Sequence, residues 1–292
     1  MLQKTFEIQL EKPHRHLLHI EIGQSHLLLN SFNANNQPAR QFEFYNYDPQ
    51  QDWSSVWTSV QEQSQLIASP EEASQGESST EKLPGLSFEN IKISWENQWV
   101  QSIPTKFYTE ALKPAYFQLN KASLNTPEDL APKELSCTAG AYVFPFAVPA
   151  AAYMAIQETF PQAIHQHKYA GIVRQIGSFH DHYSLKVLLV FYQDHFILCA
   201  FKENRLQLIN THYFVHGTGI IYHLLNAIRH SGTALTDTCV YLSGLIDGDS
   251  ALYREIYKFV PVIDVDQAPQ APFLAADPDY PSHFFAPFYK YI

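Results

Sequence analysis

Two histidine pairs are the residues of this chain whose type and spacing suit chemistry. His165 and His167 are separated by one residue, as are His180 and His182. On a strand, residues two apart share a face, and imidazole is a common zinc ligand. However, no cysteine or glutamate completes a recognisable ligand set, and a chain with 14 histidines contains such pairs by chance. We therefore predict no bound metal, and we keep these four histidines as the ligands of a less favoured metal-dependent hydrolase.

Other catalytic patterns are weaker or missing. Ser243 lies in Leu-Ser-Gly-Leu, which lacks the glycine that precedes the serine of a nucleophile elbow. Asp247 and Asp249 form an acidic pair in sequence, but capping of a helix by Asp249 is the favoured interpretation. The sequence contains no glycine-rich phosphate loop, dinucleotide fingerprint or Cys-x-x-Cys. The residue patterns alone therefore assign no catalytic group.

The elements that must position these residues are clearest in the second half of the chain. Apolar runs bounded by turns predict three successive strands, at 183–192, 195–201 and 205–213. A helix follows, with Ile220, Leu224 and Ile228 on one face. A strand at 238–244, a helix and a strand at 260–265 complete the unit.

The same order of elements occurs near the start of the chain. Strands are predicted at 16–22, 26–32 and 40–45, and Trp53, Trp57 and Val60 then share a helical face. Two copies of one supersecondary unit suggest two similar halves that face each other across a cleft. We place these halves at 1–178 and 179–292, with a polar, disordered loop at about 61–85.

The remaining segments are predicted from local signals. They are a half-buried or edge strand at 5–10, a strand or hairpin at 88–94, a short helix opened by Pro104, a strand at 116–119 and a loop at 120–134. Further along are a strand at 141–148 with Pro145 at an edge or bulge, a helix opened by Pro149, a strand at 163–167 and a helix at 169–176. The aromatic tail from 273 to 292 contains too many rings to stay exposed, so we expect it to pack onto the body.

Composition limits the class of protein. The chain has 292 residues, 46% hydrophobic and 16% charged, with a net charge of −10, which allows a large core and disfavours nucleic-acid or anionic-membrane surfaces. The three cysteines are far apart in sequence and are expected to be buried and reduced. The N-terminus has no apolar signal core, and no apolar run reaches the ~20 residues that cross a bilayer. We predict a cytoplasmic protein.

This order of strands and helices resembles the ribonuclease H-like unit of the actin-like ATPase superfamily, and its duplication strengthens the resemblance. More narrowly, the chain is similar to a bacterial family, domain of unknown function 3822, which is assigned an actin-like fold. The segments that carry this similarity are 99–107, 160–167, 242–253 and 280–285. The resemblance implies an α/β (α+β) protein made of two ribonuclease H-like units.

The resemblance also implies a nucleotide cleft, but each of its motifs is altered here. The first phosphate hairpin corresponds to Glu21-Ile22-Gly23-Gln24-Ser25, in which glutamate replaces the aspartate that organises the metal. The second corresponds to Gln193-Asp194-His195, which has no glycine to let the backbone approach phosphate. The paired glycines that admit adenine correspond to Ser243-Gly244-Leu245, in which a bulky leucine replaces the second glycine.

The altered motifs favour a non-catalytic interaction or scaffold protein on a degenerate actin-like ATPase fold, without a cofactor and with another protein as partner. The alternative is a divergent ATP-binding phosphotransferase or ATPase in which Glu21 or Asp194 organises magnesium. In either case the candidate residues of the degenerate nucleotide cleft are Glu21, Gly23, Gln24, Ser25, Gln193, Asp194, Ser243 and Gly244.

Overall fold

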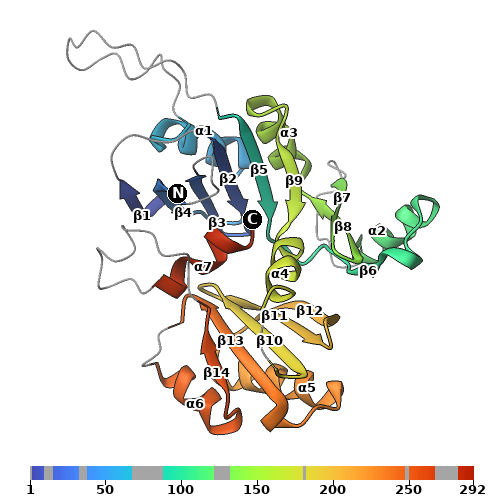
Figure 1. Cartoon of the computed structure of the whole chain (residues 1–292). Coiled ribbons are helices and arrows are strands. Elements are labelled where there is room, and N and C mark those ends of the chain that lie inside the picture. Colours follow the sequence, from blue (N-terminus) through green and yellow to red (C-terminus); the bar gives the residue numbers. More distant parts are fainter. Residues whose placement is uncertain are drawn as a thin grey trace. The chain divides into compact units, whose positions relative to one another are not determined.

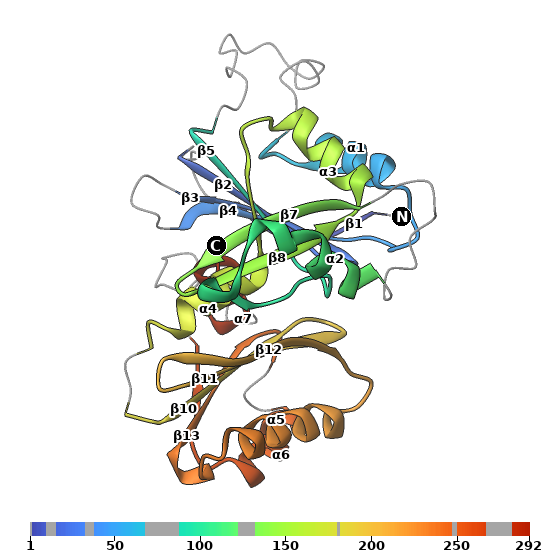
Figure 2. The ribbon, with the colours of Figure 1, turned by 90° about the vertical axis from the view of Figure 1, so that its right-hand side faces the viewer.

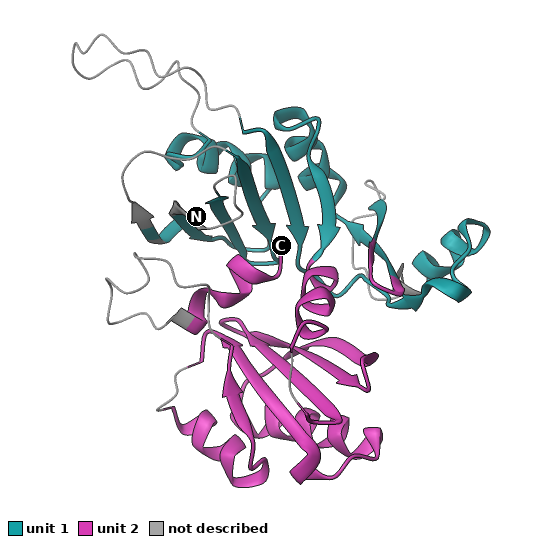
Figure 3. Cartoon of the chain, in the orientation of Figure 1, with its two compact units in different colours: residues 1–137, 143–167 teal, residues 138–142, 168–292 magenta. Residues whose placement is uncertain are grey.

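Two compact units make up the chain (Figure 3). Unit 1 comprises residues 1–137 and 143–167, and unit 2 comprises residues 138–142 and 168–292. The computed structural model describes residues 2–9, 16–32, 38–67, 88–121, 132–179, 182–246, 250–266 and 282–292.

A six-stranded mixed sheet forms the centre of unit 1 (Figure 1). In spatial order its strands are β1 (Gln3–Gln9), β4 (Pro38–Asn46), β3 (His26–Phe32), β2 (Leu17–Ile22), β5 (Asn90–Trp95) and β9 (Ile164–His167). The first four pair antiparallel, whereas β5 runs parallel to β2 and β9 runs parallel to β5. The carboxyl ends of β2 and β5 therefore meet at one edge of the sheet.

Two helices cover one face of this sheet, α1 (Trp53–Gln63) and α3 (Ala150–Thr159) (Figure 2). Asp52 caps α1, because its side chain accepts a hydrogen bond from the Ser55 backbone N–H. Residues two apart on β2 face these helices, so Leu18, Ile20 and Ile22 belong to the apolar core. The intervening His19 and Glu21 lie on the other face, where both are fully buried.

A smaller sheet, in the order β6-β8-β7, is formed by β6 (Ile103–Pro104), β8 (Tyr142–Val148) and β7 (Lys133–Ala139). Of the two positions predicted for Pro145, the edge strand is wrong, since β8 is the central strand, and the bulge stays a prediction. The Pro145 carbonyl oxygen accepts a hydrogen bond from the Gln101 N–H. The predicted 120–134 loop ends earlier than expected, because β7 begins at Lys133, and residues 122–131 lie outside the described ranges.

The strand predicted at 116–119 is also wrong. Two 3₁₀ turns, η1 (Thr105–Phe107) and η2 (Glu110–Leu112), lead into helix α2 (Lys113–Lys121). Pro114 lies in the first turn of α2, where its missing N–H has no partner to lose. The aromatic residues that suggested a strand lie in this helix, where Phe117 is buried and Tyr116 is half-buried.

Unit 2 contains a five-stranded sheet with the same succession of elements. Its strands in spatial order are β12 (Arg205–Tyr213), β11 (His195–Lys202), β10 (Leu185–Phe191), β13 (Thr238–Gly244) and β14 (Ile263–Val265). Helices α5 (Gly217–Ser231) and α6 (Ala251–Phe259) pack on one face, with Ile220, Leu224 and Ile256 in the core (Figure 2). A 3₁₀ turn, η3 (Leu235–Asp237), precedes β13.

Two further helices of unit 2 contact its sheet: α4 (Lys168–Ile176) contacts β11, and α7 (Ser282–Lys290) packs on β13. The prediction that the aromatic tail packs onto the body is confirmed for the described part, because Phe285, Phe288 and Tyr289 are buried. The predicted cap Asp249 lies outside the described residues. Ser250 caps α6 by accepting a hydrogen bond from the Tyr253 N–H.

The limits of the predicted halves can be compared with these units. Contacts group α4 with unit 2, which therefore begins at Lys168 apart from residues 138–142, whereas the predicted boundary lies at 178. The predicted 61–85 loop begins too early, because α1 continues to Gln63 and Leu66 is buried in the unit 1 core. Residues 68–87 lie outside the described ranges. Cys137 is half-buried, Cys199 and Cys239 are buried, and none of the three forms a disulfide.

Candidate functional site

A pocket of about 350 Å³ opens in unit 1 where β2 and β5 end. Gly23 and Gln24 follow β2, and Glu96 and Asn97 follow β5. The parallel pairing continues past the strand ends, because the Glu96 N–H donates to the Ile22 carbonyl at 2.8 Å. The pocket is lined by Ile22, Gly23, Gln24, Tyr47, Pro49, Gln51, Trp53, Trp95, Glu96, Asn97, Trp99, Pro149 and Ala152.

The side chain of Asn97 holds the far wall of this pocket in place. Its amide nitrogen donates to the Ala147 carbonyl at 3.1 Å, and its amide oxygen accepts from the Trp99 N–H at 2.8 Å. Pro149 precedes the first turn of α3 and leaves that helix without a side-chain cap. The pocket therefore lies between the ends of two parallel strands and the start of one helix.

The hairpin at Gly23 is closed by a neighbouring histidine. A Cβ atom built on Gly23 would lie 2.1 Å from Cε1 of His26, so the imidazole occupies the space that the glycine leaves open. The His26 ring stacks on Phe44, and its Nε2 lies 3.2 Å from Oε1 of Glu21. The Tyr47 hydroxyl donates to the Gly23 carbonyl oxygen. A phosphate at this hairpin would have to displace packed protein atoms.

The predicted residues of the first motif are consequently split. Gly23 and Gln24 line the pocket, whereas Glu21 is buried on the opposite face of β2 beside His26. Ser25 contributes its carbonyl oxygen to the Tyr47 N–H and does not line the pocket. Glu21 is therefore not positioned at this pocket to organise a metal.

Aromatic side chains form much of the pocket wall. Tyr47 meets Trp53 edge-on, with ring centroids 5.6 Å apart, and Trp95 and Trp99 complete the set. Burial, together with the negative charge of Glu96, raises the pKa of Tyr47. Among the described lining residues Glu96 is the only acidic side chain, and none is Lys, Arg or His. The described lining contains no Ser, Thr or Cys.

Two polar atoms at the pocket are buried without a hydrogen-bond partner among the described residues. They are the acceptor Oε1 of Gln51 and the donor Nε1 of Trp53. Buried polar atoms are normally paired, and exceptions point to a missing ligand or water. Because both atoms are closed off from solvent, a ligand in the open part of the pocket would not reach them without a rearrangement of these side chains.

The second predicted phosphate hairpin connects β10 and β11. Gln193 and Asp194 are exposed there. Asp194 Oδ1 lies 2.7 Å from His195 Nδ1, and its carbonyl oxygen accepts from the Phe214 N–H at 3.1 Å. The His195 ring stacks on Tyr192. The turn is thus tied to its own unit through both the side chain and the backbone of Asp194.

The predicted adenine motif at the end of β13 is closed by the neighbouring strand. Gly244 has φ +83°, and a Cβ there would lie 2.2 Å from the Phe191 carbonyl oxygen. That oxygen accepts the Leu245 N–H at 2.9 Å. The glycine therefore permits close packing between β10 and β13.

Ser243 is held by contacts within unit 2. It is buried, and its hydroxyl lies 3.4 Å from Oδ2 of Asp266. Asp266 also accepts hydrogen bonds from Lys290 and from the Tyr291 hydroxyl. This buried cluster joins the ends of β13 and α7 within unit 2.

The first histidine pair, His165 and His167, makes hydrogen bonds inside unit 1. Nδ1 of His165 accepts from Trp95 Nε1 at 3.1 Å, and Nε2 of His167 donates to the Asn97 carbonyl at 3.0 Å. Burial lowers the pKa of each ring to about 4. His182 is exposed and packs on the Tyr183 ring, while His180 lies outside the described residues. The described ranges contain no cluster of three or more His, Cys, Asp or Glu side chains suited to a metal.

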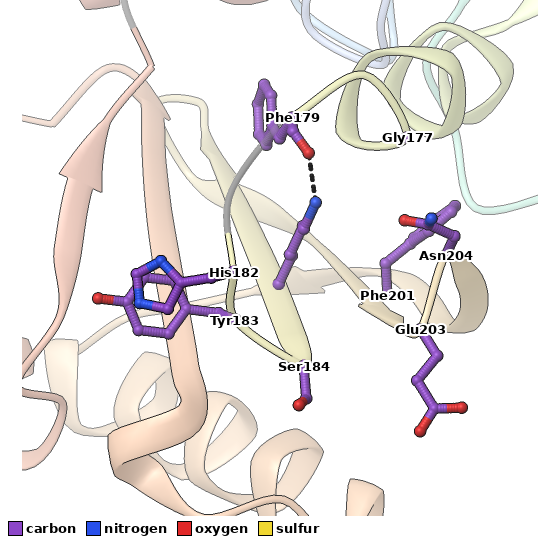
Figure 4. Close-up of a pocket in the computed structure, with 9 residues that line it drawn as sticks. Gly177, Phe179, His182, Tyr183, Ser184, Phe201, Glu203 and Asn204 are labelled. Carbon is purple, nitrogen blue, oxygen red and sulfur yellow. Dashed lines mark hydrogen bonds between the residues drawn. The ribbon is translucent and has the colours of Figure 1, made fainter.

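A larger hollow of about 540 Å³ lies in unit 2 (Figure 4). Of the predicted residues it includes His182, whose ring overlaps that of Tyr183 in this view. The one lysine in its lining, Lys186, donates to the Phe179 carbonyl oxygen. Because its cation is already bonded to the backbone, this hollow is less suited to binding than the unit 1 pocket.

The sequence reasoning missed Gln51, Trp53, Trp95, Glu96 and Trp99 as pocket residues. A usable signal was present, because parallel neighbouring strands end at the same edge of a sheet. Had the strand at 88–94 been placed beside the first hairpin, Glu96 would have been expected near Gly23.

Comparison with known structures identifies the class of protein. A protein from Bacteroides thetaiotaomicron VPI-5482, described as having an actin-like ATPase fold and unknown function, matches with a TM-score of 0.70 and 15% identity, over 86% of this chain and 90% of that one. The PilM–PilN type IV pilus biogenesis complex matches with a TM-score of 0.52 and 12% identity, over 96% of this chain and 98% of that one. The chain has the actin-like ATPase fold, which confirms the predicted fold class.

The family is shown by residues 5–263, which match the model described as "Protein of unknown function (DUF3822)". The chain belongs to this family, so the predicted resemblance is confirmed. No curated protein matches the sequence. Within the described residues, every helix is too short or too polar to cross a membrane.

Proposed function

We propose that this protein is a non-catalytic interaction or scaffold protein built on an actin-like ATPase fold that no longer binds nucleotide. The observation that carries the proposal is the filling of the glycine positions by the protein's own atoms. The His26 ring occupies the space at Gly23, and the Phe191 carbonyl occupies the space at Gly244. Nucleotide binding on this fold needs backbone that phosphate and adenine can approach.

The polar groups of the motifs support the same proposal. Glu21 lies beside His26, Asp194 lies beside His195, and Ser243 lies beside Asp266. Each group that would organise metal or phosphate is thus engaged inside its own unit. Magnesium binding would require these contacts to be broken.

A protein partner in the cytoplasm completes the proposal. The net charge of −10 disfavours nucleic acid, and among proteins of this fold PilM is known in a complex with PilN. Fold alone does not determine function. The partner is therefore proposed from the lost nucleotide site together with the precedent of a complex.

The test is a thermal melt of the full chain with and without millimolar Mg-ATP or Mg-ADP. A ligand at a hundred times its dissociation constant stabilises the folded state by about 2.7 kcal/mol, which shifts the melting temperature measurably. We expect no shift with either nucleotide. A shift that is lost in Glu21→Gln or Asp194→Asn would overturn the proposal and favour a divergent ATPase or phosphotransferase.

A further inference from the structure

We propose that His212 and His223 form a two-histidine site in unit 2 for a divalent transition-metal ion such as zinc. The site lies between the last residues of β12 and the middle of α5. Water takes the positions on the ion that the two imidazoles leave open. The inference goes beyond the proposed function, because neither the nucleotide motifs nor the unit 1 pocket takes part in it.

The fold of unit 2 brings these two rings together. His212 lies opposite Phe196 in the pairing of β12 with β11, so both side chains point to the face of the sheet that α5 covers. On α5, His223 directly precedes Leu224, which belongs to the core on this face. The ring centroids of the two histidines lie 3.8 Å apart, with an angle of 22° between the ring planes. A strand and a helix thus place two potential metal ligands side by side.

The ring nitrogens of this pair are accessible to a ligand from solvent. Both residues are partly exposed. Neither imidazole makes a hydrogen bond within the described part of the chain, and none of their nitrogens is among its unpaired atoms that are closed off from solvent. They differ in this respect from the unpaired atoms of Gln51 and Trp53 at the unit 1 pocket. An ion can therefore reach lone pairs that no internal hydrogen bond occupies.

Two adjacent imidazoles suit a divalent transition-metal ion. Imidazole nitrogen is a good ligand for zinc, copper and nickel, whereas magnesium and calcium prefer oxygen. Zinc–nitrogen bonds of about 2.1 Å at a tetrahedral ion place two ring centres about 5 Å apart, so the stacked rings have to separate by about 1 Å. Because no internal hydrogen bond holds either ring, this small rotation disturbs only ring packing.

Neighbouring aromatic rings keep the two histidines in place. The Phe196 ring lies 5.4 Å from the ring of His212 and 6.2 Å from that of His223, measured between centroids. Tyr222 meets His223 edge-on at 5.4 Å. Since both ligands are already adjacent and packed on the same phenylalanine, an ion that joins them has less side-chain entropy to overcome.

The number of protein ligands sets the strength of the site. Within the described ranges, no third His, Cys, Asp or Glu side chain completes a metal-binding group with this pair. Structural zinc sites have four protein ligands and catalytic ones three, so an ion held by two should bind more weakly and exchange readily. An ion bound here would also join β12 to α5, and it should therefore stabilise unit 2.

The test is calorimetric titration of the full chain, without a histidine tag, with zinc chloride slightly above neutral pH. His212→Gln and His223→Gln should each weaken zinc binding at least about tenfold, because even changes around the ligands of a metal cost about 10–100-fold in affinity. His230→Gln is the matched control, since it replaces an exposed histidine of the same helix, and it should leave the affinity unchanged. Magnesium chloride should bind to none of the four proteins at this pair.

A second measurement needs no variant. Diethyl pyrocarbonate modifies accessible imidazole nitrogens, and zinc should protect His212 and His223 of the natural chain from it while His230 still reacts, as located by peptide mass spectrometry. Equal zinc affinity in the natural chain and in both pair variants, no binding at millimolar zinc, or modification of the pair that zinc does not slow would overturn the inference. The stacking would then be ring packing alone. None of these outcomes bears on the proposed function, which the nucleotide melts test separately.

Discussion

The imidazole of His26 lies where a side chain on Gly23 would begin, with its Cε1 only 2.1 Å from the position of an added Cβ. Because glycine has no Cβ, another group can approach its backbone closely. In this chain the same freedom accommodates a neighbouring ring, which is held by Glu21 and by stacking on Phe44.

Gly23→Ala should destabilise unit 1 by about 1–3 kcal/mol, because the new methyl group would overlap the packed His26 ring. Denaturant unfolding followed by tryptophan fluorescence reports on this unit selectively, since all four tryptophans lie in it. Removing the ring in a Gly23→Ala/His26→Ala double variant should abolish the extra cost of the alanine. An unchanged cost in the His26→Ala background would contradict the explanation.

Gly244→Ala should destabilise unit 2 more than Gly232→Ala does. Both glycines have positive φ, +83° and +66°, which costs an alanine about 1–2 kcal/mol. Only Gly244 would also place its Cβ 2.2 Å from the Phe191 carbonyl oxygen, while Gly232 has open space. Hydrogen exchange of peptides from β10 and β13 measures the difference. Equal protection in the two variants would show that the contact with β10 carries no energy.

Tyr291→Phe should destabilise unit 2 by about 1–3 kcal/mol, because it removes one donor from the buried carboxylate of Asp266. Tyr257→Phe is the control, since its ring is 60% exposed and its substitution should stay within about 0.5 kcal/mol. Denaturant unfolding followed by far-ultraviolet circular dichroism compares the two. Equal effects would mean that Asp266 keeps its environment without the tyrosine hydroxyl.

The stability of unit 1 should fall as the pH is lowered from about 6.5 to about 4. Burial lowers the pKa of His167 to about 4 in the folded chain, whereas its ordinary value is 6.5. Between these values the unfolded chain binds a proton that the folded chain does not, so acid favours unfolding. The full loss for this one group is about 3 kcal/mol.

His167→Gln tests this dependence, because glutamine cannot titrate but keeps a donor for the Asn97 carbonyl. The stability of the variant, measured by tryptophan fluorescence, should depend less on pH in this window. An unaltered pH slope in His167→Gln would show that other groups bind the proton.

The sheet of unit 2 was predictable because its apolar runs are uninterrupted and bounded by turn residues. The strands predicted at 205–213 and 238–244 have the bounds of β12 and β13. The prediction from local sequence was wrong where the same residues suit both a strand and a helix. Tyr116 and Phe117 have strand propensity, yet Pro114 and the burial of a single face place them in α2.

The candidate site was predicted less completely, because it depends on which strands are neighbours. Gly23 and Gln24 were reached from the motif of the first hairpin. Glu96 was not, since its position beside Gly23 depends on the parallel pairing of β2 with β5, from a distant part of the sequence. The position of the His26 ring beside Gly23 was not predicted either, because His26 belongs to no recognisable sequence motif.

The packing of α7 on β13 has a consequence for the order of events during synthesis. β13 leaves the ribosome well before residues 282–291. The hydrogen bonds that Lys290 and Tyr291 donate to Asp266, beside Ser243, therefore form only after the end of α7 has been synthesised. Domains generally fold as units and from the N-terminus during translation. Unit 1 can therefore fold during translation, whereas unit 2 cannot complete its core until α7 has emerged from the ribosome. A ribosome stalled shortly before residue 282 would hold a folded unit 1 and an unfinished unit 2 that exposes apolar surface to chaperones.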